Sequence, residues 1–271
     1  MSVTHRPVRR LRPHSEELFD DDLTVEQGLE IVIDDVPYAM TMRMPGEDHD
    51  LALGFCFTEG LICGPEEMEG MEHCAGSMGE GRIFVRLARG GKDRAERLAR
   101  QRGQVSKSSC GLCGKGSLAE VHADIAPVTR TTPFTAQALW DLREKVLGLQ
   151  EVFALTGSTH SAAVADASGE VLAFAEDIGR HNALDKAIGK TLRLGLRERA
   201  HTVLVSSRLS YEMVLKAGML GAEVLAGQSA PTSLAVDFGG KLGMTVIGFL
   251  ERARMNVYTR PERVLHEPKA G

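Results

Sequence analysis

Residues 202–249 read TVLVSSRLSYEMVLKAGMLGAEVLAGQSAPTSLAVDFGGKLGMTVIGF, and in this stretch short apolar runs alternate with longer amphipathic ones. The short runs predict strands over 202–205, 223–226 and 245–249, and the longer runs predict helices over 211–220 and 232–242. Alternation of this kind is typical of a layered α/β domain, with helices packed on both faces of a mixed sheet.

The same alternation continues upstream of this stretch. Helices are predicted over 135–149 and 182–194, and runs at 162–166 and 171–174 predict a hairpin over Ser168-Gly169. Pro127 and Pro133 enclose a run rich in threonine, so we place a domain boundary there. Residues 131–271 are therefore assigned to a three-layer α/β domain.

Residues 28–130 have a mixed pattern instead. Alternating residues over 28–44 predict a hairpin that turns at Asp34-Asp35, and the acidic residues from Glu47 onward open a helix that continues through Phe57. A strand is expected over 81–88 and a charged helix over 92–102. This part of the chain is therefore expected to be a mixed α+β region.

Residues 1–27 are set apart by their charge. Arginines at 6, 9, 10 and 12 come before any acidic residue, and aspartates at 20, 21 and 22 then reverse the sign. Charge runs of this kind are usually solvated, so we expect a flexible, partly ordered arm.

The overall composition excludes several classes of protein. With 37 acidic residues against 32 basic ones, the chain lacks the positive field of a nucleic-acid-binding protein. No apolar run approaches the ~18 residues of a membrane span, so no membrane association is expected. Five cysteines cannot all pair with one another, and the cytoplasm, a reducing compartment, fits this count best.

Two of the five cysteines, Cys110 and Cys113, lie in the glycine-rich segment SSCGLCGKG (108–116), which we expect to form a mobile loop over 105–117. Lysines at 107 and 115 would favour the thiolate by charge. The residues alone leave four roles open: a sulfur carrier, a redox dithiol, half of a zinc site, or two inert thiols. A zinc site would need further ligands, for which the candidates are Cys56, Cys63, Cys74 and His122. Otherwise the remaining three cysteines are expected in the core.

Five blocks carry a specific resemblance to a known family. They are SCGLCGK (109–115), MPGED with LALGF and TEG (44–48, 51–55 and 58–60), TGSTH (156–160), EDIGRHNALDK (176–186) and SRLSYE (207–212). These blocks resemble the formate dehydrogenase accessory sulfurtransferase family, FdhD, and the likeness extends from about residue 28 to residue 259. One block departs from the family pattern, because Ser158 stands where a glycine is usual.

This resemblance implies an enzyme that carries sulfur. Cys110 would accept sulfur from a cysteine desulfurase as a persulfide, with Cys113 assisting or sharing it. The sulfur would pass to the bis-molybdopterin guanine dinucleotide form of the molybdenum or tungsten cofactor before that cofactor enters formate dehydrogenase. The resemblance also implies a homodimer without zinc. The alternative is a non-catalytic chaperone that binds the guanine dinucleotide and formate dehydrogenase.

Two helix starts are candidates for binding the anionic arms of such a cofactor. Arg180 and His181 open one predicted helix, and Arg208 precedes another, where free backbone N–H groups favour phosphate. Thr159 and His160 belong to a neighbouring block of the resemblance. For the two arginines, ion pairs with Asp177, Asp185 or Glu212 are an alternative role, and both histidines could instead be core residues.

The resemblance adds a third candidate segment and a fold. The family associates the stretch after the last predicted strand with cofactor binding, here Phe249, Leu250, Glu251, Arg252, Ala253 and Arg254, although a basic surface loop is equally compatible with these residues. The family's second domain is similar to cytidine deaminase. Zinc-dependent deamination is excluded on the residues, since the C-terminal half has no cysteine to supply the metal ligands.

Overall fold

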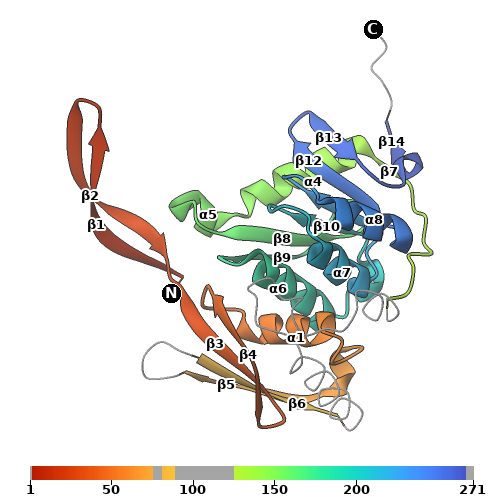
Figure 1. Cartoon of the computed structure of the whole chain (residues 1–271), viewed down its shortest axis with the longest axis horizontal. Coiled ribbons are helices and arrows are strands. Elements are labelled where there is room, and N and C mark those ends of the chain that lie inside the picture. Colours follow the sequence, from red (N-terminus) through yellow and green to blue (C-terminus); the bar gives the residue numbers. More distant parts are fainter. Residues whose placement is uncertain (1, 76–80, 89–124, 267–271) are drawn as a thin grey trace.

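The computed structural model describes residues 2–75, 81–88 and 125–266. In Figure 1 these residues form a body built around a larger and a smaller sheet, from which an N-terminal hairpin projects. The helix predicted over 92–102 and the cysteine-pair loop over 105–117 lie outside the described residues. Within the described ranges, no helix is both long and apolar enough to cross a membrane.

The larger sheet is mixed, as the alternation of the sequence predicted. Its six strands lie in the order β13-β12-β11-β10-β8-β9. β10, β11 and β12 are parallel, whereas β8, β9 and β13 each run antiparallel to the strand beside them. The strands are β8 (His160–Ala165), β9 (Val171–Asp177), β10 (Thr202–Val205), β11 (Val224–Gly227), β12 (Thr245–Glu251) and β13 (Arg254–Val257).

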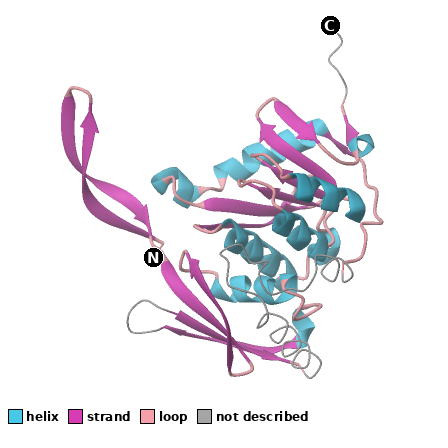
Figure 2. Ribbon diagram, viewed as in Figure 1, coloured by secondary structure: helices cyan, strands magenta, loops and turns pink. Residues whose placement is uncertain are grey.

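Helices cover both faces of this sheet, so the predicted α/β class is confirmed (Figure 2). Successive side chains of β10 are buried on opposite faces of the sheet. Val203 and Val205 belong to one buried cluster, and Leu204 belongs to another. The first cluster includes residues of α6 (Arg180–Arg193), α7 (Tyr211–Leu220) and α8 (Ser233–Leu242). The second includes residues of α4 (Ala136–Gly148).

Several short elements were not predicted, because each is too short to show a periodic pattern. They are α5 (Glu151–Thr156), the paired strands β7 (Phe134–Thr135) and β14 (Val264–Leu265), and the single 3₁₀ turns at Pro65–Glu67, Arg197–Arg199 and Pro261–Arg263.

The smaller sheet has four strands in the order β4-β3-β6-β5, with α1 (Asp48–Thr58) against it. Its strands are β3 (Gln27–Ile33), β4 (Val36–Arg43), β5 (Met68–Ala75) and β6 (Gly81–Leu87). The hairpin predicted over 28–44 is confirmed. Its two turn residues, Asp34 and Asp35, have positive φ angles of 47° and 65°, as the tight turn of a twisted hairpin requires. The edge strand β5 was not predicted.

The N-terminal arm corrects the expectation of a partly ordered tail. β1 (Val3–Arg12) and β2 (Ser15–Thr24) pair in one continuous antiparallel register. The basic and acidic runs were interpreted separately, yet they lie on opposite strands: Arg9 contacts Glu16 at 2.8 Å, and the register sets Arg6 opposite Asp21. Opposite charges across a strand pair favour pairing, which is why the change of sign produces a hairpin.

Two glycines hold the regions predicted as 28–130 and 131–271 together. α1 crosses α6 so closely that a Cβ atom at Gly54 would lie 1.9 Å from the Asp185 carbonyl oxygen, and one at Gly189 would lie 1.9 Å from that of Asp50. Real Cβ atoms do not come so near, so both helices need glycine at this crossing. Side chains of both sheets belong to the same buried cluster, so the two regions share a core.

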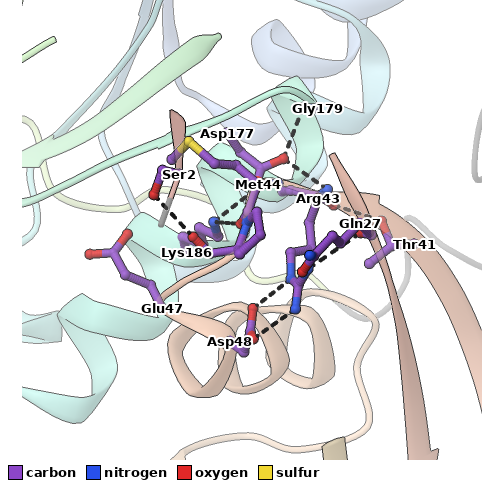
Figure 3. A network of polar contacts seen from close by, with 12 residues as sticks. Ser2, Gln27, Thr41, Arg43, Met44, Glu47, Asp48, Asp177, Gly179 and Lys186 are labelled. Atoms are coloured by element: carbon purple, nitrogen blue, oxygen red, sulfur yellow. Dashed lines mark hydrogen bonds and ion pairs between the residues drawn. The ribbon is translucent and has the colours of Figure 1, made fainter. Parts of the chain in front are cut away.

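A buried polar network completes this junction (Figure 3). Asp177, at the end of β9, accepts a hydrogen bond from the Met44 backbone N–H at 3.1 Å and pairs with Lys186 at 2.7 Å. Lys186 in turn donates to the Met44 carbonyl at 2.9 Å. Nearby, the guanidinium of Arg43 contacts both carboxylate oxygens of Asp48, at 2.8 and 3.0 Å. Residues from the sequence blocks at 44–48 and 176–186 therefore meet in this junction.

Candidate functional site

The carboxyl ends of four strands meet along one edge of the six-stranded sheet. These strands are β9, β10, β11 and β12, and the antiparallel strand β8 begins at the same edge with His160 opposite Asp177. Neighbouring strands lie about 4.8 Å apart, so the edge extends for roughly 19 Å from β9 to β12. Ligands of α/β sheets bind beyond such strand ends. All the binding residues predicted in the C-terminal domain lie on this edge or directly beside it: Thr159, His160, Arg180, His181, Arg208 and residues 249–254.

Three of these predicted residues come together at the β8 and β9 end of the edge. Nδ1 of His160 lies 3.3 Å from Oγ of Ser206, which follows β10. Burial lowers the pKa of His160, and the neighbouring charges of Arg180 and His181 lower it further. A neutral imidazole therefore lies beside a cationic group, in surroundings suited to an anion.

Arg180 and Arg208 are not engaged in the ion pairs considered as an alternative. Asp177 pairs with Lys186 at 2.7 Å and Asp185 pairs with Lys216 at 2.8 Å. Glu212 contacts His181 instead. Among the residues that the structure describes, neither arginine has an ion-pair partner. Two positive charges at the starts of α6 and α7 are thus left for a ligand.

His181 and Glu212 form a close pair between these two helix starts. His181 Nε2 lies 2.6 Å from Glu212 Oε2, and the side chains are 30% and 11% exposed. Sequence reasoning assigned Glu212 only as a partner for an arginine. The pairing of α6 with α7 at this point depends on tertiary structure, so no local signal could have shown it.

Thr159 and the acidic residues Glu176 and Asp177 have partners within the protein. Thr159 is buried, and its hydroxyl donates to Glu176 at 2.7 Å. Glu176 also accepts the backbone N–H groups of Val152 and Phe153. The two carboxylates therefore have partners other than Arg180, and the ion pair of Asp177 with Arg180 considered as an alternative does not form.

The segment 249–254 is a strand end and a turn, where a surface loop had been considered. β12 continues to Glu251, the chain turns at Arg252 and Ala253, and β13 begins at Arg254. Phe249 has a φ of 52°, which is rare for an aromatic residue, and the β12–β13 register shifts between Gly248 and Glu251. Leu250 is buried, whereas residues 251–254 are exposed. Backbone irregularities of this kind often lie next to functional sites.

Two further polar groups lie on the edge, of which Gln228 was missed from the sequence. Ser210 Oγ and Gln228 Nε2 are both shielded from solvent and have no hydrogen-bond partner within the part of the chain that the structure describes. Buried polar atoms normally have partners, so a bound group could satisfy them. Ser210 lies just before α7 and Gln228 just after β11. The strand-end rule that singled out Arg208 could have indicated Gln228 as well.

The sulfur-handling residues predicted from the sequence, Cys110 and Cys113, lie outside the described residues. Of the other three cysteines, Cys56 is a core thiol as expected, and burial together with nearby Glu59 and Asp185 raises its pKa. Cys63 and Cys74 are exposed, so their expected place in the core was wrong. Over the described ranges, no group of histidine, cysteine and acidic residues is arranged to hold a metal ion.

Comparison with known proteins assigns the chain to a family. Residues 24–265 match the model of the FdhD/NarQ family, and the chain belongs to that family. The sulfur carrier protein FdhD of Streptomyces coelicolor is 39% identical over 268 residues, which cover 96% of this chain and 94% of that protein. The sulfur carrier protein FdhD of Mycolicibacterium paratuberculosis is 41% identical over 254 residues, covering 90% of this chain and 92% of the relative.

A solved structure has the same fold. The crystal structure of a protein from Desulfotalea psychrophila, described as a "putative formate dehydrogenase accessory protein", superimposes with a TM-score of 0.78 at 22% sequence identity. The match covers 98% of this chain and 100% of the other. At this level of identity the likeness establishes the fold.

Proposed function

We propose that this protein is a sulfurtransferase that accepts sulfur from a cysteine desulfurase and transfers it to a molybdenum or tungsten bis-molybdopterin guanine dinucleotide cofactor for formate dehydrogenase. The relatives named as sulfur carrier proteins support the sulfur-carrying part of this proposal. The observation that carries the cofactor part is that Arg180 and Arg208 lie at one sheet edge, while Asp177 and Asp185 pair with lysines and Glu212 contacts His181.

The covalent step takes place on the cysteine pair. The thiolate of Cys110 attacks the terminal sulfur of the donor persulfide, a new S–S bond forms, and the donor cysteine leaves as a thiolate. This exchange needs no external oxidant or reductant. Cys113 would assist Cys110 or share the sulfur.

The cofactor is the substrate of the transfer, and the sheet edge would bind its charged arms. Arg180 and Arg208 would contact phosphate oxygens, since a guanidinium donates two parallel hydrogen bonds to such groups. Residues 249–254 lie about 10 Å further along the edge from β10, by the spacing of strands. A ligand with two guanine nucleotide arms could use both places.

Sulfur acceptance is tested by incubating the protein with a cysteine desulfurase and cysteine, followed by intact mass measurement. We expect the mass of wild type to increase by that of sulfur, and most of this increase to be absent in Cys110→Ala. The exposed residue Cys74 offers a matched control, and Cys74→Ala should behave as wild type. If wild type gains no sulfur, or if both Cys110→Ala and Cys113→Ala keep it, the carrier role is wrong and the non-catalytic chaperone remains.

Cofactor binding is tested separately with GDP-mannose, whose diphosphate is esterified at both ends as in the cofactor. Arg180→Ala and Arg208→Ala should each weaken binding by roughly tenfold or more, the contribution of one charge-assisted hydrogen bond. Arg86→Ala removes an exposed arginine from the smaller sheet and serves as the control. Equal affinity in all four proteins would contradict the assignment of the edge.

The proposal includes a cytoplasmic location, which follows from the cysteine count, and a homodimer, which follows from the family resemblance. A reducing compartment would keep Cys110 available as a thiol. Light scattering on the purified full chain measures the oligomeric state directly.

A further inference from the structure

The outer face of α5 is apolar, which is unusual for a helix on the surface of a protein. Phe153, Ala154 and Leu155 are all exposed, with exposed fractions of 44% for the phenylalanine and 60% for the leucine. The half-buried residues of this helix, Val152 and Thr156, lie one turn apart and so share its inner face. A helix without a polar outer face is normally covered, so α5 is expected to contact a partner.

The N-terminal hairpin has a second apolar surface near its turn. Leu11 and Leu18, which together we call the tip, are 66% and 80% exposed. The register sets Leu11 opposite Glu16 and Leu18 opposite Arg9, so the alternation of the strands places both leucines on one face of the hairpin. An isolated two-stranded hairpin is only marginally stable in water. The tip is therefore also expected to pack against further structure.

These two surfaces cannot meet within one copy of the chain. The hairpin is anchored beside α5, because the hydroxyl of its last residue, Thr24, lies 2.8 Å from that of Thr156 and 2.7 Å from that of Ser158. A strand rises about 3.3 Å per residue, so Leu18 lies roughly 20 Å and Leu11 roughly 26 Å along the hairpin from this anchor. In Figure 1 the hairpin extends away from α5 and from the body.

A second copy of the chain can cover both surfaces. Two copies related by a two-fold axis can place their hairpins antiparallel, so that each hairpin begins beside its own α5 and ends at the α5 of its partner. This arrangement is closed, and it covers every tip and every α5 in the pair. Charge favours the same pairing: residues 9–18 have three arginines against two glutamates, whereas residues 141–156 have three acidic residues against two basic ones.

We propose that two copies of this protein exchange their N-terminal hairpins, with the tip of each hairpin packed on the outer face of the partner's α5. The inference rests on the homodimer of the proposed function and says which surfaces form it. α5 leads directly into β8, the strand that begins at the binding edge. The hairpin of one copy would therefore lie beside the binding edge of the other.

Light scattering on the full chain over a range of concentrations tests the proposal. We expect wild type to be a dimer. Leu18→Lys and Leu155→Glu should each weaken dimerisation by roughly tenfold or more, because a charge then lies in an apolar contact. Leu194→Lys and Leu194→Glu place the same charges on an exposed leucine that follows α6, and both should dimerise as wild type does. Circular dichroism of each variant checks that it is folded.

Mixing two variants tests whether the tip and α5 contact each other directly. In a heterodimer of Leu18→Lys with Leu155→Glu, one of the two contacts is unaltered and the other brings opposite charges together. The mean mass of this mixture should therefore rise above that of either variant alone. Mixing Leu18→Lys with Leu155→Lys brings like charges together instead, so it should restore less of the dimer.

Three results would overturn the inference: a wild-type protein that is monomeric at every concentration, dimerisation of Leu18→Lys or Leu155→Glu as strong as that of wild type, or the same mean mass in both mixtures. These outcomes differ from failure of the proposed function. Sulfur acceptance is measured from the mass of the separate chain, so its loss in wild type would contradict the carrier role whatever the oligomeric state.

Discussion

The ion pair between Asp185 and Lys216 shows how single residues of this protein are held in place. Both side chains are buried, and Lys216 Nζ lies 2.8 Å from each oxygen of Asp185. Thr58 on α1 donates a further hydrogen bond to the same carboxylate at 2.9 Å. Burial raises the pKa of Asp185, while Lys216 and Thr58 act to lower it. The carboxylate therefore depends on these two partners to stay charged.

Replacing the lysine tests this dependence. Lys216→Met should lower the free energy of unfolding at pH 7 by about 3–5 kcal/mol, because it leaves a buried carboxylate without its counterion. The deficit should shrink as the pH falls towards about 5, since the pKa of Asp185 rises further without Lys216 and the folded variant takes up a proton more readily than the unfolded chain.

Urea unfolding at both pH values measures this effect. Lys241→Met removes an exposed lysine at the end of α8 and should change the stability little. A deficit in Lys216→Met that is small at pH 7, or that grows as the pH falls, would contradict this account of the pair.

Individual site residues differed in how far the sequence could place them. A strand-end rule brought His160, Arg180 and Arg208 to one edge, because it depends only on the order of strands and helices. Their partners could not be predicted in the same way. Whether Arg180 or His181 would contact Glu212 depends on the approach of α6 to α7, which is decided by packing.

At the scale of elements, the crossing of α1 and α6 is the tightest contact between the two regions. Gly54→Ala places a methyl group against the backbone of α6, where a Cβ would lie 1.9 Å from a carbonyl oxygen. The backbone must move, so we expect a loss of about 1–3 kcal/mol or more. At about 2–4 °C for each kcal/mol, thermal unfolding would detect it.

The matched control for this substitution is Gly148→Ala in α4. A Cβ atom there meets nothing within 4 Å, so the change should be neutral or slightly stabilising. Equal melting temperatures for the two variants would show that the helices can separate without cost.

Elements with long, regular patterns were predicted well, and the exceptions have physical causes. α7 lies over 211–220 as predicted, because its apolar face and its closing Gly221 are both visible in the sequence. β5 was missed because it is an edge strand whose Glu69, Glu72 and Cys74 are exposed, so apolar residues do not recur along it. β13 is short, with exposed residues alternating with half-buried ones, and it was not predicted either.

At the scale of the whole molecule, the N-terminal hairpin shows a limit of interpreting charge along the sequence alone. The basic run and the acidic run each predicted a solvated segment, and each is in fact largely exposed. Their order, basic and then acidic, also makes them complementary when the chain folds back. In Figure 1 the hairpin extends away from both sheets, so its own cross-strand contacts must supply much of its order.

The junction at Gly54 and Gly189 has a consequence for how this protein could be divided or recombined. Because α1 lies against α6 without intervening side chains, a fragment made of residues 131–271 would expose the apolar and charged surface that α1 normally covers, including Asp185 without its partner Thr58. The two regions are therefore poor candidates for separate expression or for exchange with other proteins. Any rearrangement of the gene would have to keep α1 and α6 in the same protein.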